Sequence, residues 1–294
     1  MSKNFNLNSV GLICEFNASV WTARKLDRKE SDKVVEGAGA ASKGAARVNK
    51  NLLAGRPELE EISQLVTRAR NYVIDNTLPW SDSGQRFLIG ARFPEFDARL
   101  EKYREEFALK TSEFVTIYPA LITAQAMALG AMFDRKEFPS PQEIAGKFGM
   151  TINYLPVPAA GDIRVDIGNQ AQDELRKKLQ SLADARVEKA LEDMTTRFVD
   201  HLKRMAKGLE MTDKVTKKGE PIGNRFTETL VTSAFELCDL VRDYNLAADP
   251  DLAHARRLLE NALTGVTVHT LREDLAKRED VRVAVKGILS KFEI

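Results

Sequence analysis

Two long helical patterns bracket a short stretch of strand-like sequence. Apolar residues recur every three or four positions from about 96 to 132 and again from about 170 to 209, which is the spacing of one helix face. Between them, residues 162–168 alternate between polar and apolar side chains, as in a strand with one wet face. We therefore expect a long antiparallel helical hairpin that carries a small β element at 148–168. Such arms are more typical of binding and assembly than of catalysis.

Three prolines qualify this picture. Pro119 lies inside the first helical pattern, and we expect it to kink or divide that helix because proline lacks an amide hydrogen and clashes with the preceding turn. Pro156 and Pro158 end the first strand of the β element. Proline cannot donate to a neighbouring strand, so this strand is predicted to lie at the edge of its sheet.

The N-terminal part of the chain has a different pattern. Residues 8–17 predict a strand, and residues 86–91 a second short strand that would join the same sheet. The highly charged residues 23–36 indicate a short exposed helix. The small residues from Gly37 to Ala46 indicate either a flexible link or a helix packed close to another backbone.

The fold class predicted from these patterns is mainly α with a small β element (α+β), built as a long antiparallel helical hairpin with a short antiparallel sheet. Further helices are expected after Pro57 and over 226–244, 250–263 and 267–292. The chain is predicted to divide into an N-terminal strand and basic segment, a helical arm with its β element, and a C-terminal helical region: 1–56, 57–212 and 224–294.

Composition places the chain among soluble proteins. It has 294 residues, of which 43% are hydrophobic and 30% charged, and its net charge of +1 does not steer the whole molecule toward nucleic acid or an anionic membrane. Cys14 and Cys238 are far apart and have no metal-site spacing, which is typical of a reducing compartment. We expect no membrane-spanning helix, because no apolar run approaches the length of one, and we expect no signal peptide. We expect a cytoplasmic protein, in the host cell if a phage encodes it, with no membrane partner.

Motifs that would carry chemistry are weak. Gly37–Gly44 resembles a phosphate-binding loop, but Ser42 precedes Lys43 and a glycine follows it, which is the wrong order for that loop. The three histidines stand alone, without metal-ligand spacing. Asp162 and Asp166 share a predicted strand face with Arg164 between them, which favours a solvated face over acid–base work. We expect no catalytic residue, no metal and no cofactor.

A cluster of cations beside an aromatic residue is the best candidate for contact with a partner. Trp21 is followed by four cations within eight residues, and such a group can stack on a base and contact phosphates. The alternative is that Trp21 anchors the core while the cations are solvated. The candidate interaction or nucleic-acid contacts, including two at the β element, are Trp21, Arg24, Lys25, Arg28, Lys29, Lys43, Arg47, Lys50, Tyr154 and Arg164.

The order of several segments resembles a known family. The segments are Trp21-Thr-Ala-Arg-Lys-Leu, Phe138-Pro-Ser-Pro-Gln-Glu-Ile-Ala-Gly-Lys-Phe, Met150-Thr-Ile-Asn-Tyr-Leu-Pro-Val-Pro and Asp162-Ile-Arg-Val-Asp-Ile, followed by a long charged helix. They are similar to an uncharacterised family of bacteriophage and prophage proteins, over about residues 10–250. Members of that family are often encoded near a MoxR-like or cobaltochelatase-like AAA+ ATPase. The resemblance implies a phage origin and such an ATPase as partner, and it implies no catalytic residues.

Two functions therefore remain open on the sequence. The first is a non-enzymatic interaction or assembly protein, acting with an AAA+ ATPase or with its own copies as a homo-oligomer. The second is a protein that binds single-stranded DNA in phage replication or recombination, with the basic segment lining a groove. An enzyme is the least favoured class, because no acid, base, nucleophile and metal set converges in the sequence.

Overall fold

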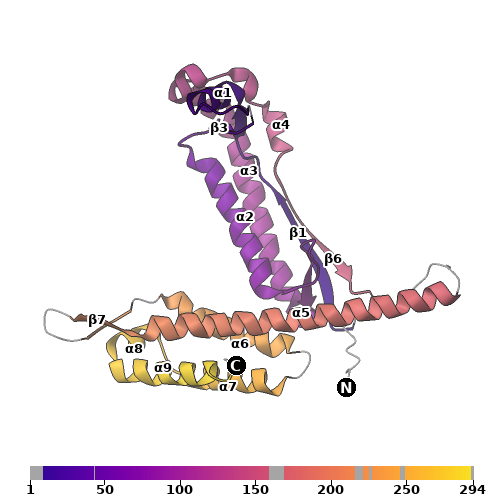
Figure 1. Ribbon diagram of the computed structural model, residues 1–294, viewed down its shortest axis with the longest axis vertical. Coiled ribbons are helices and arrows are strands. Elements are labelled where there is room, and N and C mark those ends of the chain that lie inside the picture. Colours follow the sequence, from indigo (N-terminus) through magenta and orange to yellow (C-terminus); the bar gives the residue numbers. More distant parts are fainter. Residues whose placement is uncertain are drawn as a thin grey trace. The chain divides into compact units, whose positions relative to one another are not determined.

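The computed structural model describes residues 9–42, 44–158, 169–215, 221–224, 227–245 and 249–292. It is mainly helical with a small antiparallel sheet, which confirms the predicted fold class (Figure 1). The strands are β1 (Gly11–Ser19), β2 (Arg24–Asp27), β3 (Val48–Asn51), β4 (Leu78–Pro79), β5 (Arg86–Ile89), β6 (Gly149–Pro156), β7 (Met211–Val215) and β8 (Pro221–Gly223). The helices are α1 (Arg28–Gly37), α2 (Pro57–Asn76), α3 (Phe93–Leu129), α4 (Pro141–Ala145), α5 (Asn169–Leu209), α6 (Glu228–Tyr244), α7 (Pro250–Leu263), α8 (Val268–Glu273) and α9 (Leu275–Leu289).

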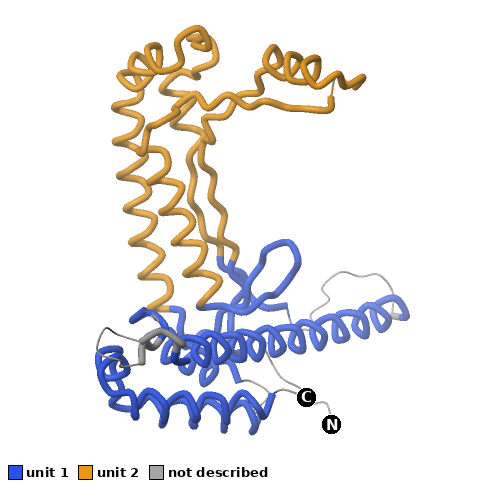
Figure 2. Tube along the Cα trace, turned by 60° about the vertical axis from the view of Figure 1, so that its left-hand side comes forward, with its two compact units in different colours: residues 1–14, 76–93, 154–294 blue, residues 15–75, 94–153 orange. Residues whose placement is uncertain are grey.

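The chain forms two compact units, each built from several stretches of sequence (Figure 2). Unit 1 comprises residues 1–14, 76–93 and 154–294, and unit 2 comprises residues 15–75 and 94–153. The two units alternate along the chain, so neither coincides with one of the three predicted segments.

The helical hairpin of this protein is formed by α2 and α3 within unit 2. Three contacts fix its direction: the ring of Tyr72 stacks 5.5 Å from that of Phe96, Arg68 pairs with Glu106 at 3.3 Å, and Glu61 pairs with Lys110 at 2.9 Å. As the residue number decreases along α2, the residue number of the partner on α3 increases. The two helices are therefore antiparallel (Figure 1).

The predicted pairing of the two long helices is therefore wrong. Helix α3 packs with α2 in unit 2, whereas α5 belongs to unit 1 and packs with α6 and α9. Periodicity identifies an apolar face, but the face itself does not specify which helix covers it. Here α2 supplies the match, through apolar residues that are buried with Phe107, Phe114 and Tyr118 of α3: Leu59, Ile62, Leu65, Val66 and Ala69.

Helix α3 is continuous through Pro119 and is not divided there. The proline lies on the exposed side of the helix. Phe114, Tyr118 and Leu121 are buried around it, so the packing of unit 2 holds the backbone helical on both sides. Tertiary contacts outweigh the local cost of the missing amide hydrogen bond.

The strand predictions hold for the residues that the structure describes. One sheet has the order β4-β5-β1-β6, and Gly11 to Cys14 of β1 pair antiparallel with Ile89 to Arg86 of β5. The strand at β6 ends at Pro156 and lies at the edge, as its prolines predict. Asp162–Gly168, the other predicted strand of the β element, lies outside the described residues.

Residues 23–36 are only partly helical, contrary to prediction. Arg24–Asp27 form β2, which pairs antiparallel with β3, and the helix begins at Arg28. The Asp27 carboxylate accepts a hydrogen bond from the Glu30 amide at 3.1 Å and so caps α1. After α1 the described small residues are not helical, and Gly39 adopts a positive φ of 64°, in agreement with the predicted link.

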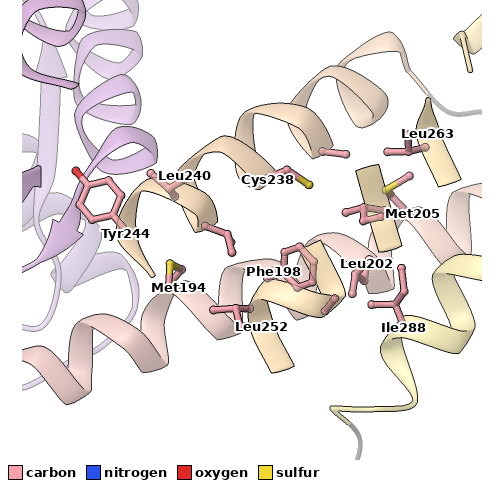
Figure 3. Close-up of a cluster of buried hydrophobic side chains, with 14 of the residues drawn as sticks. Met194, Phe198, Leu202, Met205, Cys238, Leu240, Tyr244, Leu252, Leu263 and Ile288 are labelled. Carbon is pink, nitrogen blue, oxygen red and sulfur yellow. The ribbon is translucent and has the colours of Figure 1, made fainter. Parts of the chain in front are cut away.

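Unit 1 is organised around the C-terminal half of α5. Its apolar face, with Met194, Phe198, Leu202 and Met205, is fully buried against residues of α6, α7 and α9 (Figure 3). The predicted helices at 226–244 and 250–263 correspond to α6 and α7, and 267–292 contains α8 and α9. The described residues from 169 to 292 are thus mainly helical, as the apolar spacing predicts.

Candidate interaction surfaces

Five of the predicted cations lie close together in unit 2, on β2, α1 and the residue before β3. Arg24 and Lys25 lie on β2, Arg28 and Lys29 begin α1, and Arg47 precedes β3. The pairing of Asp27 with Val48 brings Arg47 next to the start of α1. All five side chains are exposed, and none forms an ion pair with a described residue. This surface is available to an anionic partner.

Lys50 is not part of that surface. It is only 7% exposed, its ammonium group donates to the Met132 carbonyl at 2.7 Å, and it pairs with the Glu137 carboxylate at 2.5 Å. A buried cation needs such partners to offset the loss of hydration. Lys50 therefore has a structural role instead of the predicted nucleic-acid contact. The sequence alone does not distinguish the two roles, because lysine serves in both.

The two aromatic candidates are both packed. The ring of Trp21 is half-buried and meets Tyr118 edge-on at 5.7 Å, so the core-anchor alternative describes it better than base stacking. Tyr154 meets Phe93 edge-on at 5.0 Å. The remaining candidates, Lys43 and Arg164, lie outside the described residues.

The titratable groups that could do chemistry are buried or dispersed. Burial raises the pKa of the Cys238 thiol to about 12 and that of the Tyr118 hydroxyl to about 12, so neither ionises near neutral pH. Burial lowers the pKa of His201, whose Nε2 lies 3.1 Å from the Leu230 carbonyl oxygen. Within the described residues, no group of three or more His, Cys, Asp or Glu side chains could hold a metal ion.

A small apolar hollow lies in unit 1 between α5 and the β4–β5 hairpin. Its accessible volume is about 10 Å³, room for about one water molecule, and the guanidinium of Arg186 lies 4.9 Å from the ring centre of Trp80 beside it. Small-molecule sites are typically about 300–1,000 Å³ and combine apolar walls with convergent polar groups. This hollow is therefore a shallow apolar depression and is too small for a substrate. Its walls are Leu78, Trp80, Phe87, Arg186, Val187, Ala190, Leu191 and Tyr244.

The outer face of α3 carries no charge over its last turns and the short turn that follows. The run from Phe114 to Phe133 contains no Asp, Glu, Lys or Arg, although such residues make up 30% of the chain. One face of this run is buried in the core of unit 2, and eleven residues of the other face are exposed: Thr116, Ile117, Pro119, Ala120, Thr123, Ala126, Met127, Ala128, Gly130, Ala131 and Met132. Met127 is 90% exposed.

This run corrects the sequence-based view of membrane spans. The helical stretch Gly90–Met132 contains an 18-residue window with a mean hydropathy of 1.5, long and apolar enough by composition alone to cross a membrane. The prediction that no run approaches this length is therefore wrong. The same stretch supplies Phe114, Tyr118 and Leu121 to the core of unit 2, although only 28% of the apolar window is buried. Counting charges between 113 and 134 would have revealed the run.

The N-terminal half of α5, residues 169–189, is the other large exposed element. None of its leucines is buried, its charged residues have solvent access, and Leu182 is 52% exposed. In both views it extends beyond α6–α9 of the same unit (Figures 1 and 2). The sequence predicts one apolar helix face here, and apolar periodicity alone does not distinguish a core face from a binding face.

Comparison with other proteins adds no assignment. No protein-family model matches the chain, and no match was found among the curated proteins or the solved structures.

Proposed function

We propose that this chain is a non-enzymatic interaction protein that binds another protein chain through the charge-free outer face of α3. The observation that supports this most is the exposure of eleven surface residues in one run without a charged side chain. Water-facing helices of soluble proteins normally carry charges on their outer face, and extended uncharged surfaces mark interaction sites. Exposed alanine and glycine also permit a close approach of a second backbone.

The partner that the family resemblance favours is an AAA+ ATPase, and the other candidate is a second copy of this chain. Several apolar residues quoted for the resemblance are buried in the core of unit 2, namely Phe138, Ile144 and Met150. They therefore support a shared fold rather than a shared activity. A phage origin and a location in the host cytoplasm belong to the same proposal.

A mass measurement in solution tests the proposal. Replacing Met127 by Glu places a charge in the centre of the uncharged face without touching the core, so the folded state should keep its circular dichroism spectrum and melting temperature. We expect the wild-type chain to exceed its monomer mass of 32.9 kDa, or to form a complex with the ATPase, and the variant to do neither. A wild-type chain that stays monomeric with and without the ATPase contradicts the proposal.

Single-stranded DNA binding is a second candidate, supported by the exposed cations Arg24, Lys25, Arg28, Lys29 and Arg47. Nucleic-acid binding of this kind weakens steeply with salt, because each phosphate contact releases a counterion. Replacing Arg24 and Lys25 by Gln should lower both the affinity and its salt dependence, while Lys102→Gln, exposed on α3, serves as the matched control. Binding that is absent at low salt, or independent of salt, excludes this candidate.

A further inference from the structure

A row of three leucines runs along the projecting half of α5. Leu175, Leu179 and Leu182 are four and three residues apart, so they lie on one face of the helix, one turn above the other. None of the three is buried. An isolated helix gains little from local propensity, and an amphipathic helix becomes stable when its apolar face is covered. The spacing matches the anchor pattern by which helices recognise partner proteins.

The charges nearest this row are positive, although Lys177 lies on the opposite side with the acidic residues and Arg176 pairs with Asp173 at 3.3 Å. At 3.6 residues per turn, Arg176 and Lys178 flank the leucines on either side, and Arg186 continues the row by one turn. The acidic residues of this half all fall on the opposite half of the helix: Asp173, Glu174, Asp184 and Glu188. The apolar row is thus bordered by positive charge, even though the segment as a whole is nearly neutral.

The row leads to the apolar hollow of unit 1. Arg186 and Val187, about one turn beyond Leu182, are among its walls, and the β4–β5 hairpin supplies Trp80 and Phe87 on the other side. The hairpin is held against α5 by the ion pair between Lys189 and Asp82 at 2.7 Å. The apolar walls of the hollow therefore extend the apolar surface of the row toward the hairpin.

We propose that the leucine row and this hollow form one docking surface for an acidic amphipathic helix of a partner protein. Charge complementarity selects this occupant: acidic side chains beside an apolar stripe would meet Arg176, Lys178 and Arg186, whereas a second copy of α5 would oppose cations with cations. The apolar walls of the hollow add contact area for the partner's apolar stripe at the end of the row. The inference rests on the proposed function, since it names a second binding surface of an interaction protein.

Two synthetic helical peptides serve as probes. Both carry leucine at the a and d positions over about four heptads, and they differ only in having Glu or Lys at the flanking e and g positions. Binding of each fluorescein-labelled peptide to the full-length protein is measured by anisotropy at low and moderate salt. We expect the Glu peptide to bind, to bind more weakly as salt rises, and the Lys peptide not to bind.

The row is tested by the double variant Leu179→Gln and Leu182→Gln, which should weaken binding of the Glu peptide at least tenfold. The matched control, Gln180→Ala with Ser181→Ala, changes neighbouring exposed positions off the row and should bind like the wild type. Because these residues are on the surface, circular dichroism should be unchanged in both variants.

Three outcomes would overturn the inference: equal binding of the Lys and Glu peptides, no binding of either, or dissociation of a homodimer by the leucine variant. The last outcome would make a second copy of the chain the occupant. The Met127→Glu variant lies in unit 2 and should leave peptide binding unchanged. The peptide experiment therefore tests the α5 surface alone, and its result does not depend on the interaction proposed for α3.

Discussion

At the scale of single residues, Tyr244 links a helix of unit 1 to a strand through one hydroxyl group. The side chain is fully buried, its oxygen accepts from the Ile89 amide at 3.0 Å, and it donates to the Asn76 carbonyl at 2.9 Å. Burial raises the pKa of this hydroxyl, so it stays protonated and can serve as donor and acceptor together. It fixes the end of α6 against β5.

Replacing Tyr244 by Phe should therefore lower the free energy of unfolding by about 1–3 kcal/mol, because a buried amide loses its acceptor while the packing is kept. Urea unfolding followed by circular dichroism measures this loss. Tyr103→Phe removes the same atom from a half-exposed ring and should have a much smaller effect. Equal effects of the two substitutions would contradict the role given to the Tyr244 hydroxyl.

His201 should make the stability of unit 1 sensitive to mild acid. The ring is 3% exposed, and burial together with Arg204 lowers its pKa below the ordinary 6.5. Below pH 6.5 the unfolded chain binds a proton that the folded chain does not, so stability is complete above this pH and falls as the pH decreases. The slope is up to about 1.4 kcal/mol per pH unit until the folded pKa is reached.

The measurement is the free energy of unfolding between about pH 7.5 and 5.5, a range above the usual carboxylate pKa values. His201→Gln should flatten the dependence, since the amide can still donate to the Leu230 carbonyl. His254→Gln, on the exposed side of α7, should leave it as in the wild type. A wild-type stability that does not change over this range would contradict the assignment of a neutral buried imidazole.

At the scale of elements, α5 ends at a buried arginine. The guanidinium of Arg278 on α9 donates to the carbonyls of Leu209 at 2.9 Å, Gly208 at 2.9 Å, Glu210 at 3.2 Å and Asn224 at 2.9 Å. The last carbonyls of a helix have no partner within it and carry partial negative charge. One planar group thus closes the end of α5 and ties α9 to it.

Arg278→Lys should cost about 2–4 kcal/mol, because one ammonium group cannot reproduce the fork of four hydrogen bonds and a buried charge would lose partners. The free energy of unfolding measures the loss. Arg282→Lys, one turn further along α9 and paired with Glu279, should leave that energy nearly unchanged. An Arg278→Lys variant as stable as the wild type would show that the carbonyls find other partners.

The long helices and the strands β1, β5 and β6 were predictable, whereas β2 and the packing partner of each helix were not. The apolar spacing of α2, α3 and α5 is local information, and it identified each helix to within a few residues. Which helix covers a face depends on contacts that no local pattern encodes, and α3 pairs with α2 rather than α5. The same limit explains Pro119, since the buried residues around it decide that the helix continues.

The candidate site divides in the same way. The exposed cations at Arg24, Lys25, Arg28, Lys29 and Arg47 were predictable, because charged residues of a short polar segment rarely find partners inside. Lys50 differs from them because its ammonium group contacts the Met132 carbonyl and the Glu137 carboxylate. Both partners lie far from Lys50 in the sequence. The hollow beside Trp80 likewise depends on residues from three distant segments, so it became visible only in the folded chain.

At the scale of the whole molecule, both units present exposed surfaces suited to other chains. Unit 2 has the charge-free face of α3 and the exposed cations, and unit 1 has the leucine row of α5 with its hollow. Each unit has its own buried core, and these surfaces lie outside those cores. The proposed function in binding would account for these exposed features, which stability alone does not require.

Site-specific photo-cross-linking in cells tests this function most directly. A benzoylphenylalanine placed at Met127 reports on the charge-free face, and one placed at Glu105, exposed on the charged part of the same helix, is the matched control. We expect position 127 to give a covalent adduct with a second copy of the chain or with an AAA+ ATPase, identified by mass spectrometry, and position 105 to give none. The adduct should disappear when Ala128 is also replaced by Glu. No protein adduct at position 127, or equal adducts at both positions, would contradict the proposed interaction.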